Sequence, residues 1–148
     1  MLENKLIQNH KIIATYSKKK PKLSLKNVEW KRINIFDFKK NSFEYLEKPD
    51  IVILCSWPGL PNYTSKIHEN RILFFQKKLI LNLISNGVKN ITILGTCFEY
   101  GNIEGKLKEN LKTKPTNSYS KAKDQLRKYL KSLGKKFKFN YVWARLFY

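Results

Sequence analysis

Short apolar runs alternate along the chain with longer segments in which apolar residues recur at helical spacing. The apolar runs predict strands over residues 11–16, 30–35, 50–56 and 139–147, and a further strand that begins at Asn90 and ends at Thr96. The helical spacing predicts helices over 42–47, 65–86 and 119–133, and residues 1–8 resemble the end of another helix. This alternation is typical of a parallel sheet with crossover helices and predicts an α/β fold.

The segment over 65–86 carries apolar residues on nearly all sides, which favours packing in the core of the domain. Gly87 follows it at the place where a glycine ends a helix. Pro58, Gly59 and Pro61 break the chain before it. No repeat or linker interrupts the pattern, so the sequence indicates one small domain.

Length and composition agree with a single α/β domain. The chain has 148 residues, of which 42% are hydrophobic, enough to fill one core. The sequence contains no apolar run of the ~18–20 residues that cross a bilayer. Residues 1–8 lack the apolar core and cleavage site of a signal peptide, so we expect a cytoplasmic protein without membrane contact.

A formal net charge of +19 raises the alternative of nucleic-acid binding. Only four of the 30 basic residues are arginines, however, and arginine is the usual bidentate reader of phosphates and bases. The lysines are scattered along the whole chain. We therefore rank nucleic-acid binding below the alternatives, and expect the positive surface to attract a pyrophosphate-bearing ligand.

The two cysteines and the two histidines do not form a metal-binding pattern. Cys55 and Cys97 each follow an apolar strand, and neither has a histidine or a second cysteine at the spacing of a zinc site. His10 and His68 lie far apart in the sequence. The sequence therefore predicts two reduced thiols and no metal.

Tyr119 and Lys123 are four residues apart and share one face of the predicted helix. A nearby cation favours the phenolate and lowers a tyrosine pKa from its usual ~10. Such a pair can move protons to or from a hydroxyl or carbonyl group. Upstream, the strand that ends at Thr96 is followed by the pair Tyr100-Gly101.

The order of Thr96, Tyr100-Gly101, Tyr119 and Lys123 resembles that of the extended short-chain dehydrogenase/reductases. Within that group it resembles the NAD-dependent epimerase/dehydratase family, which acts on nucleotide-linked sugars. Similar segments occur at 48–57, 86–89 and 140–148. The resemblance implies a Rossmann-like doubly wound parallel sheet, and a homodimer formed through the helices over 65–86 and 119–133.

The resemblance also implies catalytic roles. Tyr119 would be the general acid/base, Lys123 would lower its pKa and bind the nicotinamide ribose, and Thr96 would orient the substrate oxygen. Cys97 and Phe98 stand where dehydratases carry Asp-Glu and would contact the substrate. Dehydration is therefore disfavoured, and a 4-keto reductase or an epimerase is expected.

Further cofactor contacts follow from the same resemblance. Asn34 and Ile35 would lie by the adenine, although the family usually has Asp at the first of these positions. Cys55 and Ser56 would lie by the cofactor ribose and phosphates, and Asn70 near the nicotinamide. The first predicted strand ends without an acid and with lysines nearby, so NADP is favoured over NAD.

The main departure lies at the start of the chain. The family begins with a strand, a Gly-rich turn and a helix that hold the pyrophosphate, whereas all six glycines lie beyond the second predicted strand. The missing strand is the middle one of the sheet, so its absence would leave a central gap. We expect residues 1–148 to form a single partial NAD(P)-binding domain without the sugar-binding part, as a fragment, a split gene product or a degenerate homologue. A non-catalytic remnant that serves binding or assembly is the alternative.

Overall fold

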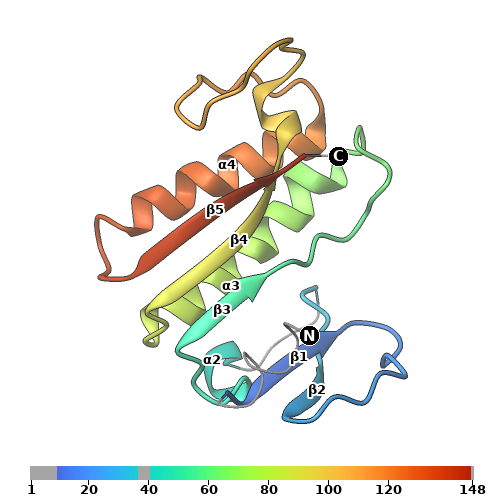
Figure 1. The fold of residues 1–148 in the computed structure, drawn as a ribbon, viewed down its shortest axis with the longest axis vertical. Coiled ribbons are helices and arrows are strands. Elements are labelled where there is room, and N and C mark those ends of the chain that lie inside the picture. Colours follow the sequence, from blue (N-terminus) through green and yellow to red (C-terminus); the bar gives the residue numbers. More distant parts are fainter. Residues whose placement is uncertain (1–9, 37–40, 148) are drawn as a thin grey trace.

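The computed structural model describes residues 10–36 and 41–147. Its elements alternate as the sequence predicts (Figure 1). They are β1 (Ile12–Tyr16), β2 (Val28–Arg32), α2 (Ser42–Tyr45), β3 (Ile51–Leu54), the π-helix η1 (His68–Ile72), α3 (Leu73–Ser85), β4 (Asn90–Thr96), the 3-10 helix η2 (Cys97–Tyr100), α4 (Ser118–Leu133) and β5 (Asn140–Leu146). The prediction for residues 1–8 lies outside the described residues.

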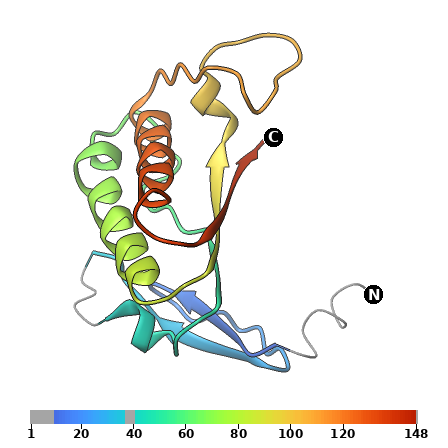
Figure 2. The same cartoon turned by 90° about the vertical axis from the view of Figure 1, so that its left-hand side faces the viewer.

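The strands form two parallel sheets. One contains β1 and β2, and the other contains β3, β4 and β5 in that order. α3 connects β3 to β4 and α4 connects β4 to β5. Both helices lie side by side on one face of the three-stranded sheet (Figure 2). This arrangement confirms the predicted parallel sheet with crossover helices.

The core fills the space between this sheet and the two helices. Ile91 and Ile93 of β4 are almost fully buried against residues of α3 and α4, among them Ile80 and Leu126. Successive side chains of a strand point to opposite faces, so the neighbours of these isoleucines point away from the helices. The same alternation leaves Ile53 of β3 66% exposed on the opposite face.

The expected gap in the sheet is present among the described residues. β1 and β3 are each an edge strand of their own sheet, and no described strand joins them. In the doubly wound order the missing strand would lie between these two. Their unpaired edges present backbone groups that can accept another strand.

Most element boundaries lie within two residues of the prediction, and two elements differ by more. The second strand covers Val28–Arg32 rather than 30–35, because the Asn34 side chain accepts a hydrogen bond from Phe36 N (3.2 Å) and turns the chain. The predicted helix over 65–86 begins as η1 and continues as α3. α3 ends at Ser85, and Gly87 follows as the predicted stop, with φ +122° and Val88 N bonded to Leu83 O. Within the described part of the chain, no helix is long and apolar enough to cross a bilayer.

Candidate active site

The candidate site lies where β4 ends and α4 begins. Asn117 caps α4: its side chain accepts from Ser120 N (2.8 Å), and the Ser120 hydroxyl accepts from Asn117 N (3.2 Å). This reciprocal capping fixes the first turn of the helix. Tyr119 therefore lies in that turn with Lys123 one turn later, and both side chains are buried.

Thr96 ends β4 and caps η2. Its hydroxyl accepts from Phe98 N (3.4 Å), while its own N–H donates to the Glu99 carboxylate (3.0 Å). The Thr96 side chain lies near enough to the Tyr119 phenol to act on its pKa. The fold thus brings Thr96 and Tyr119 together from positions 23 residues apart, with Lys123 on the same helix.

Lys123 is enclosed by protein. Its Nζ donates to Leu94 O (2.7 Å) and lies 4.2 Å from the centroid of the Trp57 ring. Burial lowers the pKa of Lys123 to about 8, while Glu99 and Cys55 act in the opposite direction. A larger share of this amine is therefore neutral near physiological pH than of a lysine in water.

The pKa of Tyr119 differs from the expectation. Burial raises it, and this effect outweighs that of the Thr96 side chain, which lowers it. The prediction of a lowered pKa through Lys123 was wrong for this structure, because it considered the neighbouring charge and not the burial of the phenol. Tyr119 is therefore held as a neutral phenol that can donate a proton.

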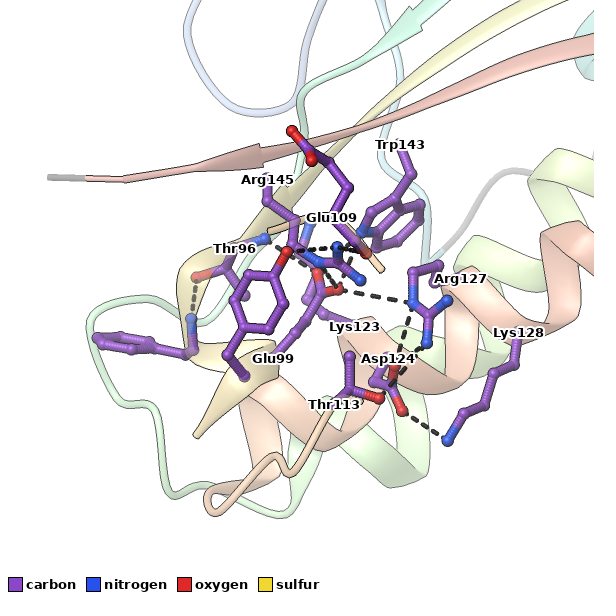
Figure 3. A network of polar contacts seen from close by, with 12 residues as sticks. Thr96, Glu99, Glu109, Thr113, Lys123, Asp124, Arg127, Lys128, Trp143 and Arg145 are labelled. Atoms are coloured by element: carbon purple, nitrogen blue, oxygen red, sulfur yellow. Dashed lines mark hydrogen bonds and ion pairs between the residues drawn. The ribbon is translucent and has the colours of Figure 1, made fainter. Parts of the chain in front are cut away.

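A buried carboxylate supports the end of β4, as Figure 3 shows. Glu99 is fully buried and accepts hydrogen bonds from Trp143 Nε1 (2.9 Å) and Arg145 Nε (2.9 Å) as well as from Thr96 N. Arg127 of α4 lies 3.7 Å from the same carboxylate. One acid thus joins β4, β5 and α4 around the candidate site.

Gly95 is required by this cluster. A Cβ atom at Gly95 would overlap Trp143 Nε1 and come within 2.7 Å of the Glu99 carboxylate. Sequence reasoning missed Glu99, Trp143 and Arg145 as site residues. A single sequence gives no signal that joins Glu99 to side chains more than 40 positions away.

The other predicted site residues lie in two groups. Cys97 and Phe98 belong to η2 beside Thr96, and Cys55 follows β3 close enough to Lys123 to affect its pKa. Asn34 and Ile35 follow β2, a strand of the other sheet.

The other two predicted cofactor contacts, Ser56 and Asn70, differ from each other in their surroundings. Ser56 follows β3, and its carbonyl accepts a hydrogen bond from Gln76 (2.8 Å). Asn70 lies on η1 and is exposed, whereas its neighbour His68 is fully buried beside Tyr119.

The residues present fit a nicotinamide dinucleotide only in part. Tyr119 and Lys123 have the phenol and the amine that could bond to ribose hydroxyls, but the amine is covered by the Trp57 ring and bonded to Leu94 O. In the doubly wound order the Gly-rich turn that cradles the pyrophosphate comes before the strand that corresponds to β1, and all six glycines of residues 1–148 lie after β2. In the part of the chain that the structure covers, no group of three His, Cys, Asp or Glu residues is placed to hold a metal ion.

Solved structures share this fold. UDP-N-acetylglucosamine 4-epimerase from Methanobrevibacter ruminantium matches with a TM-score of 0.79 and 22% identity, over 95% of this chain and 48% of that chain. UDP-glucuronic acid 4-epimerase from Bacillus cereus, solved with NAD, matches with a TM-score of 0.67 and 18% identity, over 82% of this chain and 39% of that one. The chain thus spans less than half the length of these two proteins.

The sequence matches no curated protein closely enough to count as a relative. The family described as "NAD dependent epimerase/dehydratase family" matches over residues 1–148, the whole chain. The chain therefore belongs to the NAD-dependent epimerase/dehydratase family.

Proposed function

We propose that this chain carries the acid–base part of an NAD(P)-dependent enzyme that reduces or epimerises a nucleotide-linked sugar. One observation carries the proposal: Tyr119 and Lys123 are buried one helical turn apart on α4, with Thr96 near enough to act on the phenol. The side chains that the family's chemistry requires are thus adjacent and shielded from water.

In this proposal Tyr119 exchanges a proton with the sugar hydroxyl or carbonyl. The Thr96 hydroxyl, which lies near that phenol, orients the substrate oxygen beside it. Lys123 would hold the ribose hydroxyls of the cofactor, which requires the Trp57 ring to move off its amine, and would stabilise the phenolate that forms. The nicotinamide ring would supply the hydride chemistry when bound.

The substrate class rests on the family and on the positions after Thr96. The two solved enzymes above are 4-epimerases of UDP-sugars by their names. Cys97 and Phe98 offer no carboxylate for water elimination, so we favour a 4-keto reductase or an epimerase over a dehydratase. Lys18 and Lys19 follow β1 without an acid, which favours NADP.

Polypeptide beyond these 148 residues would complete the enzyme in this proposal. The free edges of β1 and β3 and the smaller length of the chain relative to the matched enzymes support this. A strand, Gly-rich turn and helix would fill the gap, and further segments would bind the sugar. We also propose a cytoplasmic homodimer through α3 and α4, since Phe74 of α3 is 59% exposed.

A non-catalytic binding or assembly module is the second candidate. It is favoured by the positions of the six glycines, which all lie after β2 and so provide no Gly-rich turn ahead of β1. The two candidates differ in cofactor affinity. A module would bind neither NAD nor NADP when folded, as measured by calorimetric titration.

The test of the enzyme proposal uses the product of the complete gene. The DNA that flanks codons 1 and 148 should encode the Gly-rich turn upstream and further sequence downstream. Tyr119→Phe should then abolish most conversion of UDP-linked sugars, measured as oxidation of reduced cofactor for a reductase and as interconversion of the two sugars for an epimerase. Tyr129→Phe, on the same helix, is the matched control and should retain activity. Full activity of Tyr119→Phe would refute the role of that phenol.

A further inference from the structure

His68 is a fully buried histidine that the proposed chemistry does not use. It lies on η1, with Nε2 2.7 Å from Asn62 O and Nδ1 3.1 Å from the indole nitrogen of Trp57. A carbonyl oxygen can only accept a hydrogen bond, and an indole N–H can only donate one. His68 is therefore neutral, with its proton on Nε2 and an acceptor at Nδ1.

The indole that His68 holds lies against Lys123. The Lys123 ammonium is 4.2 Å from the Trp57 ring centroid, and the same ring meets Tyr119 edge-on with centroids 5.9 Å apart. Lys123 is 3% exposed and has Leu94 O as a hydrogen-bond acceptor. The electron-rich face of Trp57 therefore replaces part of the water that a buried cation loses.

The segment between Trp57 and His68 is shaped for this contact. Gly59 has φ +89°, and a Cβ atom there would come within 3.1 Å of the His68 ring. The carbonyl of Tyr63 accepts from Tyr119 N (2.9 Å), and the Tyr63 ring contacts that of Tyr119. The segment thus encloses the phenol and the amine together.

We propose that His68 is a positioning residue, which holds the Trp57 ring over the Lys123 ammonium through the hydrogen bond accepted at Nδ1. The inference rests on the proposed function, in which Lys123 is the cation of the site, and adds that His68 and Trp57 hold that cation in place. Its test needs neither cofactor nor substrate. Failure of this inference and failure of the enzyme proposal can therefore be told apart.

The first measurement uses the unaltered chain. Long-range proton–nitrogen NMR of the imidazole should show His68 as the Nε2-protonated tautomer, with His10 as the internal comparison. The Trp57 indole proton should exchange slowly with solvent. An Nδ1-protonated His68 or a rapidly exchanging Trp57 indole would overturn the inference.

Two variants of equal polarity provide the second measurement. The Asn oxygen in His68→Asn can replace the Nδ1 acceptor, whereas the Gln amide in His68→Gln reaches the Nε2 position and leaves the indole unpaired. We expect the Trp57 indole proton to exchange with solvent at least about tenfold faster in His68→Gln than in His68→Asn. Loss of a hydrogen bond of about 1.4 kcal/mol gives a factor of that size. Equal exchange rates in the two variants would refute the role of Nδ1.

The third measurement reads the effect on Lys123. Its pKa, followed by NMR of labelled lysines, should fall by about half a unit or more in His68→Gln and Trp57→Leu, and should stay near the wild-type value in His68→Asn. The other titratable groups that act on Lys123 are Glu99 and Cys55, and all variants retain them. His68→Gln should have no further effect in a Trp57→Leu background. An undiminished effect there would show that His68 does not act through Trp57.

Discussion

Replacement of Glu99 by glutamine tests how the site is held together. The change keeps the size of the side chain and removes the charge from a fully buried position. Arg145 loses its carboxylate partner at 2.9 Å, and the added NH2 group faces donors from Thr96 and Trp143. The variant therefore leaves the Arg145 guanidinium without an anionic partner. It also sets the new amide N–H groups against the N–H groups of Thr96 and Trp143, so that donors face donors.

The expected cost follows from the partners that remain. Removal of one member of a buried ion pair costs ~3–5 kcal/mol. Arg145 keeps the Tyr100 hydroxyl (2.8 Å) and Glu109 O (3.3 Å) as acceptors, so we place Glu99→Gln at the lower limit, about 3 kcal/mol. For a domain of this size that corresponds to a Tm lower by about 6–12 °C.

Urea unfolding followed by circular dichroism, together with calorimetric melting, measures the change. Glu44→Gln is the matched control, because Glu44 pairs with Lys48 on the exposed surface of α2 and its loss should leave the midpoint unchanged. Arg145→Met added to Glu99→Gln should recover part of the lost stability. A loss below about 1 kcal/mol, or strict additivity in the double variant, would refute the buried ion pair as the support of this region.

Four further changes test other parts of the structure. Gly95→Ala should cost more than about 3 kcal/mol in urea unfolding, since its Cβ would overlap the buried cluster, whereas Gly134→Ala, at φ −61°, should be neutral or slightly stabilising. The pKa of Lys123 is lowered from 10.5 to about 8, so between these values the unfolded chain binds the proton and the folded chain does not. Stability should therefore rise as pH increases above about 8, and Lys123→Met should remove that rise in urea midpoints measured up to about pH 9.5. Asn117→Ala should cost about 1 kcal/mol through loss of the α4 cap, and an unchanged unfolding midpoint would contradict this. Phe74→Lys should convert a dimer to a monomer in light scattering if α3 forms the interface, and a dimer that persists would exclude Phe74 from that interface.

The pattern of the sequence was sufficient for most of the fold. Alternating runs located the strands and helices, and the position of Gly87 identified the end of α3. The absence of glycine near the first strand predicted the gap between β1 and β3. These features depend on local secondary-structure propensity and on the order of the elements along the chain. A single sequence contains both.

The local sequence pattern did not predict which residues surround the candidate site. The spacing of Tyr119 and Lys123 placed both on one helical face, but the direction of the Tyr119 pKa depends on burial by segments far away in the sequence. The same holds for His68, which the sequence marked only as an isolated histidine. Its partners are a loop carbonyl and the Trp57 indole, and neither has a recognisable spacing.

The open edges beside the gap give the high positive charge a physical role. Edge strands and an apolar sheet face, such as that around Ile53, are surfaces on which copies of a chain can stack into aggregates. A net charge of +19 on 148 residues makes two copies repel each other before their edges can meet. Colloidal stability of residues 1–148 alone should therefore decrease as salt screens this repulsion.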